Sequence, residues 1–207
     1  MKTLLGLVIT LFILHYSANS REPGVEIKTA LLIVDIQNFY FPGEQPGLVN
    51  VIPASIKAKE ILEIFREKQQ LVVHIRHKSA RGFEIHKNAE PLPGEKVITK
   101  EEVNSFQKTD LLEYLTSHKI SRLVIIGMQT QMCVEAAVRG GHDYGFECVV
   151  ISDACATRDV KFNDRTVKAE DVQTTILATI SDGRYGKVTD LKVFKENMDK
   201  YLYQKLD

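Results

Sequence analysis

Short apolar segments rich in β-branched residues alternate with longer amphipathic segments from residue 29 to the end of the chain. The apolar segments lack the alternation of apolar and polar side chains that marks a strand with one face in solvent. Strands of a parallel sheet that is buried on both faces have this composition, and helices connect them along the chain. The sequence therefore predicts an α/β fold with a doubly wound sheet of six strands.

The predicted elements follow from these two patterns. Strands are expected over 29–36, 70–76, 96–99, 122–128, 147–152 and 186–191. Helices are expected over 54–68, 111–118, 131–140, 169–181 and 193–205, and Asp110 with Glu113 has the pattern of a capping box for the second helix. The segment between residues 76 and 96 contains Gly82, Pro91, Pro93 and Gly94 and is expected to be a loop of functional importance.

Charge and glycine content exclude several classes of function. The chain has 207 residues, 27 Lys and Arg, and 27 Asp and Glu, with no block of like charges, so nucleic acid is not an expected partner. No glycine-rich segment matches a dinucleotide-binding or phosphate-binding loop. With no internal repeat and no linker, the sequence predicts one globular domain.

The first 20 residues have the features of a secretory signal. Lys2 precedes an apolar run over 4–14, and small residues at 18 and 20 suit a signal peptidase. This run is about half the roughly 20 residues that a membrane-spanning helix needs, so cleavage is preferred over an uncleaved anchor. We expect a signal peptide over 1–20, a domain over 21–207, a secreted or periplasmic location, and no stable membrane anchor after cleavage.

The three cysteines form an odd set, so at least one thiol of a monomer is unpaired. Cys148 and Cys155 flank a predicted strand, and seven residues of strand would hold them about 20 Å apart, far beyond disulfide reach. We expect both to be reduced packing residues.

Three chemically active side chains follow predicted strands. Asp35, Lys100 and Cys133 each lie at or shortly after a strand end, where open parallel sheets bind ligands. Each also has an ordinary structural alternative: a turn cap, a solvated cation and a small buried apolar residue. If their strands are neighbours, however, the set is that of an activated cysteine nucleophile.

Four segments resemble the isochorismatase-like cysteine hydrolases, which include nicotinamidases, N-carbamoylsarcosine amidases and ureidoacrylate amidohydrolases. They are ALLIVDIQN at 30–38, Lys100 with Ser105 and Phe106, GMQTQMCV at 127–134, and DACAT at 153–157. The third is the most specific, and together the four extend over nearly all of the predicted mature chain.

This resemblance implies a three-layer α-β-α fold with a six-stranded parallel sheet and a catalytic triad of Asp35, Lys100 and Cys133. The aspartate takes the thiol proton, the sulfur attacks an amide-type carbonyl, the amine leaves, and water hydrolyses the thioester. Lys100 and the start of a helix at Cys133 are expected to favour the thiolate. The implied oxyanion hole consists of the backbone N–H groups of Gln129 and Cys133, with a cis peptide between Met128 and Gln129.

Metal and substrate contacts are less determined. Nicotinamidases of this family hold a divalent ion through an Asp-x-His pair, but here Ile75 stands where the aspartate would be, which leaves only His77 and His86. We therefore expect no metal and no cofactor, and a structural role for His74. Candidate substrate-binding residues, each with packing or loop-fixing as the alternative, are Gln37, Phe39, Phe41, Phe83 and Phe106.

The leading hypothesis is a metal-independent cysteine amidohydrolase that cleaves a C–N bond of a small amide or ureide. The alternatives are a catalytically silent binding protein of the same fold, a metal-dependent nicotinamidase and a thiol redox protein, although the last lacks a resolving cysteine. The resemblance also implies a homo-oligomer. The sequence offers only a hint of it, in apolar positions of the C-terminal segment that could equally pack on the sheet: Val193, Phe194, Met198, Tyr201 and Leu202.

Overall fold

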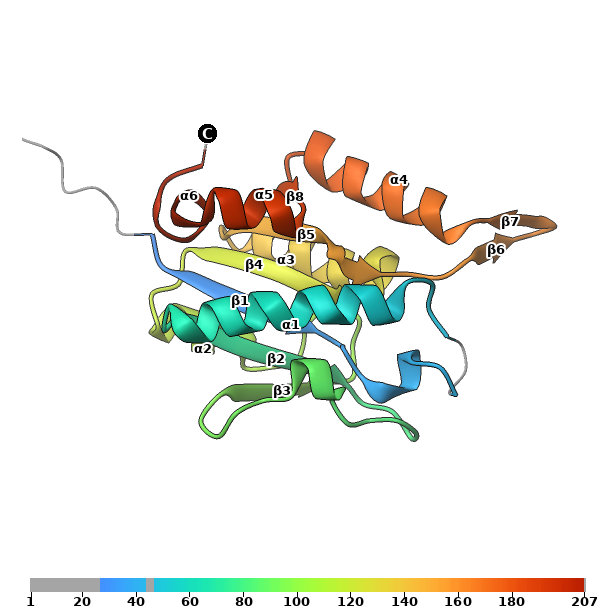
Figure 1. The fold of residues 1–207 in the computed structure, drawn as a ribbon, viewed down its shortest axis with the longest axis horizontal. Helices are drawn as coiled ribbons and strands as arrows, with labels where there is room; N and C mark the ends of the chain where they lie inside the picture. The colour runs from blue at the N-terminus through green and yellow to red at the C-terminus, as the bar shows by residue number, and fades with distance from the viewer. Residues whose placement is uncertain (1–26, 44–46, 207) are drawn as a thin grey trace, which may run out of the picture.

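The computed structural model describes residues 27–43 and 47–206, so the predicted signal segment lies outside the described residues. A six-stranded sheet forms the centre of the molecule, with the strand order β3-β2-β1-β4-β5-β8 (Figure 1). All of its pairings are parallel. The strands are β1 Thr29–Val34, β2 Leu71–His77, β3 Lys96–Lys100, β4 Arg122–Met128, β5 Glu147–Ala156 and β8 Lys187–Thr189.

The order of the strands determines where a ligand can bind. The chain adds β2 and β3 on one side of β1 and then places β4, β5 and β8 on the other side. The sheet therefore changes direction between β1 and β4, and ligands of doubly wound sheets bind at the carboxyl ends of strands at this point.

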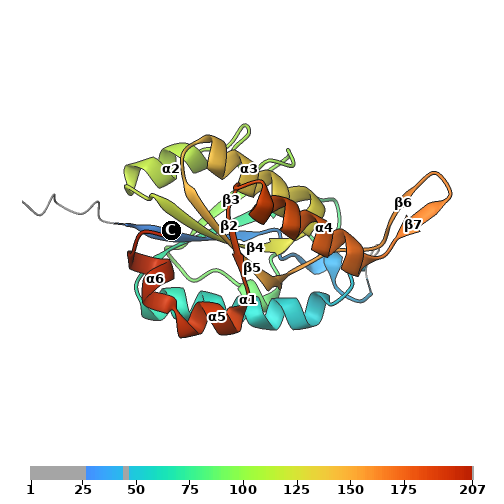
Figure 2. The same ribbon diagram turned by 90° about the horizontal axis from the view of Figure 1, so that it is seen from above.

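Helices cover both faces of the sheet, as Figure 2 shows. One face carries α1 Val51–Glu67, α5 Leu191–Glu196 and α6 Met198–Tyr203, and the other carries α2 Leu111–Ser117, α3 Glu135–Asp143 and α4 Ala169–Asp182. Side chains of β1 alternate between the two cores, with Leu31 and Ile33 in one and Leu32 and Val34 in the other. The predicted three-layer architecture is confirmed.

Helix boundaries differ from the predictions for identifiable reasons. Helix α1 begins at Val51, before the expected residue 54, because Pro53 lies in the first turn, where the missing N–H is not needed. Asp110 makes no capping bond, since its carboxylate lies 2.5 Å from the ammonium of Lys96. The hydroxyl of Thr109 accepts from the N–H of Leu111 instead.

The C-terminal segment forms two short helices instead of one, and Asn197 separates α5 from α6. Phe194 and Leu202 are fully buried in the core beneath them. The burial of these two side chains favours packing on the sheet, and not an oligomer interface, as the role of the apolar positions in this segment. The homo-oligomer stays a prediction.

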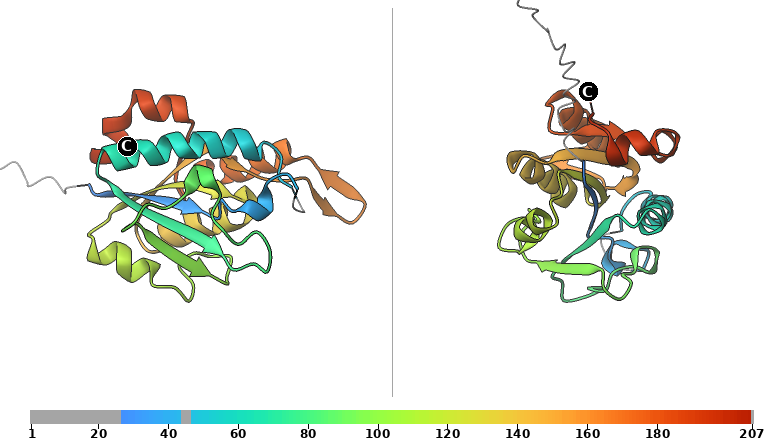
Figure 3. Two further views of the ribbon diagram at one scale, coloured as in Figure 1. Left: turned by 60° about the horizontal axis from the view of Figure 1, so that its bottom comes forward. Right: turned by 90° about the vertical axis from the view of Figure 1, so that its left-hand side faces the viewer.

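Strand β5 is longer than expected. After a register shift it continues to Ala156, and Cys155 and Ala156 pair with Gly127 and Met128 of β4. A further antiparallel hairpin, β6 Val160–Phe162 and β7 Arg165–Val167, was not predicted. It projects from the body of the molecule, as the left-hand view of Figure 3 shows. Short elements with exposed side chains leave little signal in a sequence.

Two further predictions concern the cysteines and the membrane. Cys133, Cys148 and Cys155 are all buried and unpaired, as expected. Within the part of the chain that the structure describes, no helix has the length and apolar character that crossing a bilayer requires. The remaining short helical turns are Asn38–Tyr40, Lys87–Ala89 and a π-helical turn at Thr130–Val134.

Candidate active site

Asp35 directly follows the central strand β1, at the point where the sheet changes direction. Its backbone N–H donates to the carbonyl of Ile75 in β2, 3.0 Å away, and its φ of 50° turns the chain out of the strand. The residue is fully buried. The side-chain carboxyl group of Asp35 is thus fixed at the C-terminal ends of the strands.

Lys100 is the last residue of β3 and is also buried. Its ammonium nitrogen lies 2.8 Å from Oδ2 of Asp35 and 3.2 Å from Sγ of Cys133. Strand β3 is not a neighbour of β1, so the long side chain passes across the end of β2 to reach the carboxylate. The structure therefore brings the three predicted catalytic residues together.

Cys133 lies in the π-helical turn Thr130–Val134, between β4 and α3. The peptide between Met128 and Gln129 is cis, as the resemblance implied. The start of this connection is close to β1, because a Cβ at Gly127 would stand 1.9 Å from the carbonyl oxygen of Val34. Only glycine lets the two strands approach in this way.

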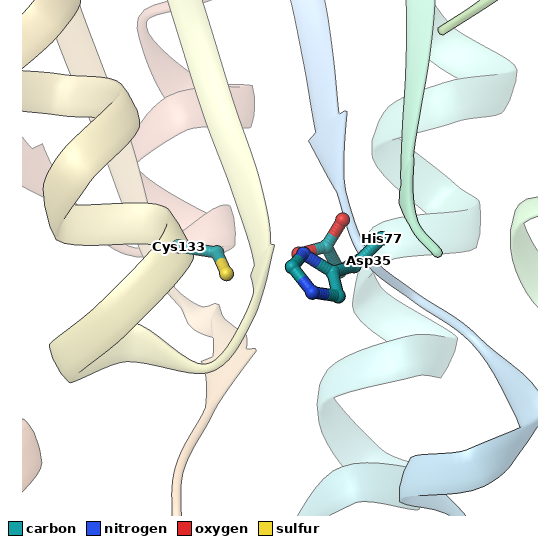
Figure 4. Close-up of side chains that lie close together, drawn as sticks. All are labelled: Asp35, His77 and Cys133. Carbon is teal, nitrogen blue, oxygen red and sulfur yellow. The ribbon is translucent and has the colours of Figure 1, made fainter. Parts of the chain in front are cut away.

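His77 was missed as a partner of the triad. It is the last residue of β2 and pairs in register with Lys100 of β3, and its Nδ1 lies 3.1 Å from the ammonium nitrogen. Figure 4 shows the imidazole beside the carboxyl group of Asp35, with the thiol of Cys133 pointing toward them. The signal that could have found it is its position, because His77 ends a strand just as Lys100 does.

Burial sets the protonation of the two reacting groups. Desolvation raises the pKa of Asp35, and the nearby charge of Lys100 opposes this effect only in part. Desolvation, followed by the charge of Asp35, raises the pKa of the Cys133 thiol to about 12, against the lowering effect of Lys100. Lys100 favours the thiolate, as expected, but burial outweighs this effect, so the resting group is a thiol beside a carboxyl group.

Comparison with known proteins identifies the family. Residues 29–182 match the isochorismatase domain. The chain belongs to the isochorismatase family. It is 37% identical over 177 residues to the uncharacterized isochorismatase family protein YddQ of Bacillus subtilis. The aligned region covers 80% of this chain and 98% of YddQ.

Other relatives agree in fold and include hydrolases. The crystal structure of a putative isochorismatase hydrolase from Oleispira antarctica superposes with a TM-score of 0.77 at 36% identity, over 80% of this chain and 95% of that one. Streptothricin hydrolase of Streptomyces noursei is 30% identical over 73% of this chain and 56% of its own length. The family consists of hydrolases, with amidohydrolases among them, such as ureidoacrylate amidohydrolase RutB of Pantoea ananatis, 30% identical over 49% of this chain and 40% of RutB.

A divalent ion, which the alternative of a metal-dependent nicotinamidase requires, does not fit these residues. Ligand atoms of Asp35, His77 and Cys133 lie within 4.8 Å of one another, a spacing that would suit a metal. The ammonium of Lys100, however, is within 3.2 Å of all three and brings its own positive charge to the place an ion would take. His74 lies elsewhere, buried with its Nε2 2.9 Å from Glu95.

The contacts of the predicted substrate-binding residues favour the alternative roles for three of them. The side-chain amide of Gln37 is fully used, donating to the carbonyls of His77 and Phe83 and accepting from the N–H of His77. Phe41 is buried and stacks on His86, and Phe106 is buried against Tyr144 and Phe146. Gln37 therefore holds His77 in place, and the two rings pack.

Phe39 and Phe83 are partly exposed in the segments that Gln37 joins. Phe39 contacts Tyr40, and the guanidinium of Arg76 lies 4.2 Å above the ring of Phe83. For these two residues, substrate binding stays a prediction.

Proposed function

We propose that the protein is a metal-independent cysteine amidohydrolase that cleaves the C–N bond of a small amide or ureide through a thioester. The observation that carries this proposal is the ammonium of Lys100 bridging the carboxylate of Asp35 and the sulfur of Cys133. Relatives whose names state an amide or ureide substrate, nicotinamidase and ureidoacrylate amidohydrolase, support the reaction class.

In the acylation step, Asp35 takes the proton of the Cys133 thiol while the sulfur attacks the carbonyl carbon. The raised pKa of Asp35 makes it a stronger base than an ordinary carboxylate and partly offsets the raised pKa of the thiol. The ammonium of Lys100 stabilises the developing thiolate. The backbone N–H groups of Gln129 and Cys133 are the proposed donors to the oxyanion.

The C–N bond then breaks, and the leaving nitrogen takes the proton that Asp35 received. Water attacks the resulting thioester, Asp35 accepts its proton, and the C–S bond breaks. Sulfur regains a proton from Asp35, which returns the site to its resting state. Two rounds of proton transfer through one buried carboxyl group thus complete the cycle without a metal.

The experiment is a screen of primary amides and ureides for ammonia release by the purified protein. We expect Cys133→Ala and Cys133→Ser to abolish release, and the control Cys148→Ala to retain it, because the Cys148 sulfur packs against Val138 and Phe146 away from Lys100. Hydroxylamine should trap the thioester as a hydroxamate in the native protein only. Full activity of Cys133→Ala would overturn the proposal.

We further propose an exported protein that acts as a homo-oligomer. The support is the secretory pattern of the sequence over 1–20 and the resemblance to oligomeric members of the family. The size of the mature protein in solution and its location after expression test the two statements separately.

A further inference from the structure

Arg158 reaches the edge of the active site because β5 is longer than the sequence indicated. The second pairing of β5 with β4 ends at Ala156 opposite Met128, the residue that precedes Gln129. Arg158 follows two residues later, and its Nε donates to the side-chain oxygen of Gln129 at 3.1 Å. The guanidinium is thus fixed beside the residue whose backbone N–H is a proposed oxyanion donor.

Gln129 joins several polar groups at this place. Its side-chain oxygen also accepts from the amide of Gln131, 3.0 Å away. The hydroxyl of Tyr40 is close enough to Gln129, Asp35, Cys133 and Arg158 for these groups to shift its pKa. Tyr40 is only 6% exposed, so the cluster lies at the boundary between the core and the site.

Within the described residues, the charge of Arg158 has no carboxylate partner. Lys100 is paired with Asp35, and the neighbouring Asp159 accepts from Lys168 and from the N–H of Ala169. Among residues 27–43 and 47–206, no carboxylate pairs with Arg158, and its terminal nitrogens have no hydrogen-bond partner. A partly exposed guanidinium therefore presents its two terminal nitrogens beside Gln129, at the edge of the active site.

We infer that Arg158 binds a carboxylate of the substrate, so that the substrate is a small amide with an anionic group, such as the monoamide of a dicarboxylic acid. This inference rests on the proposed function. The two terminal nitrogens of the planar guanidinium fork match a carboxylate with two parallel hydrogen bonds. Since Arg158 also holds Gln129, a bound carboxylate orders the residue that supports the oxyanion, and binding is coupled to the chemical step.

Matched pairs of substrates test the inference. Each pair has the same carbon skeleton and differs only in the second group: malonamate and malonamide, succinamate and succinamide, glutaramate and glutaramide. We expect the native protein to prefer the acid of at least one pair. Arg158→Gln should lower kcat/KM for that acid about 100-fold, the effect of losing a hydrogen-bonded charge pair, and change the diamide less than about threefold.

Two further variants separate charge from structure. Arg158→Lys keeps the charge without the fork and should retain part of the preference. Arg165→Gln removes the same charge from the exposed strand β7 and should leave both members of each pair unchanged. Because Gln129 is held by Arg158, part of the loss for the acid should appear in kcat as well as in KM.

The outcomes distinguish this inference from the proposed function. If diamides are hydrolysed in a Cys133-dependent reaction and no acid is preferred, the inference is wrong and the proposed function stands. If Arg158→Gln lowers kcat/KM equally for the acid and the diamide, Arg158 has a structural role and the inference is also wrong. If no amide in this set or in the wider screen is hydrolysed in a Cys133-dependent reaction, both fail.

Discussion

The ammonium nitrogen of Lys100 lies 3.1 Å from Nδ1 of His77, and the two residues end neighbouring strands. An ammonium has no lone pair, so the imidazole must accept this bond through an unprotonated Nδ1 and carry its hydrogen on Nε2. Gln37 fixes the backbone of His77 through both its N–H and its carbonyl. A chain of contacts thus runs from a buried amide through His77 to the cation that contacts the nucleophile.

Substitution of His77 by its two amide analogues tests this contact. Asparagine places an oxygen near the position of Nδ1, whereas glutamine places its amide near the position of Nε2. Because hydrogen bonds to charged groups contribute about 1.5–3 kcal/mol, we expect His77→Gln to lower kcat about 10- to 100-fold and His77→Asn to lower it less than about fivefold. Steady-state kinetics on one substrate measure both, and equal losses in the two variants would contradict the role of Nδ1.

Asp35→Asn should have opposite effects on hydrolysis and on alkylation of Cys133. Hydrolysis is lost because the base is gone. The negative charge of Asp35 is a cause of the raised Cys133 pKa, while Lys100 remains to lower it, so the thiolate population rises. We expect faster labelling by iodoacetamide at pH 7 than in the native protein, measured by peptide mass spectrometry, with Cys148 as the unreactive internal control. Slower labelling would show that the carboxylate stabilises the thiolate instead.

The pH dependence of kcat/KM should have its acid limb above the ordinary range of an aspartate. Asp35 acts as a base only when ionised, and burial raises its pKa from 3.8. Activity should therefore fall as the pH decreases through this raised value, and not only near pH 4. A profile that stays flat down to pH 4 would contradict a desolvated base.

The strands could be predicted from the sequence because burial on both faces leaves a continuous run of apolar side chains, as in Leu31–Val34 of β1. The second half of β5 could not. Ser152 and Asp153 interrupt its apolar run, and only the register shift against β4 shows that the strand continues to Ala156. This continuation also carries Arg158 to the active site, so the same unpredicted feature hid a functional residue.

The candidate catalytic residues were predictable as a set of strand ends, but their partners were not. Whether His77 meets Lys100 depends on the register of β2 and β3, which a single sequence does not specify. The raised pKa of Cys133 could not be predicted for a related reason. A helix start and a lysine favour a thiolate, yet the degree of burial, which reverses the result, depends on the packed structure.

Glu95 should stabilise the fold in a pH-dependent manner. Burial alone would raise its pKa, but hydrogen bonds from Arg66, from the N–H of Leu92 and from His74 together lower it to about 2. Since its folded pKa is depressed, this stabilisation is fully present above the unfolded value of 4.5 and is lost as the pH falls toward 2.

Glu95→Gln should reduce the free energy of unfolding by about 2 kcal/mol at pH 7 and by much less at pH 3. The control Glu63→Gln, which removes a more exposed carboxylate on α1, should change it by less than about 0.5 kcal/mol at either pH.

Gly127→Ala should destabilise the protein more than Gly145→Ala, although both glycines have a positive φ. Gly127 has a φ of 133°, and a Cβ there would stand 1.9 Å from the carbonyl oxygen of Val34, in the strand that leads to Asp35. Neither β1 nor β4 can move away, because the two strands are paired in register along their whole length. Gly145 has a φ of 85°, but no atom lies within 4 Å of the place a Cβ would take, so Gly145→Ala isolates the cost of the backbone conformation alone.

We expect the free energy of unfolding, measured in urea, to fall by about 1 kcal/mol in Gly145→Ala and by at least about 3 kcal/mol in Gly127→Ala. Equal losses in the two variants would show that the strands adjust to the added methyl group, and that the close approach of β1 and β4 does not require glycine.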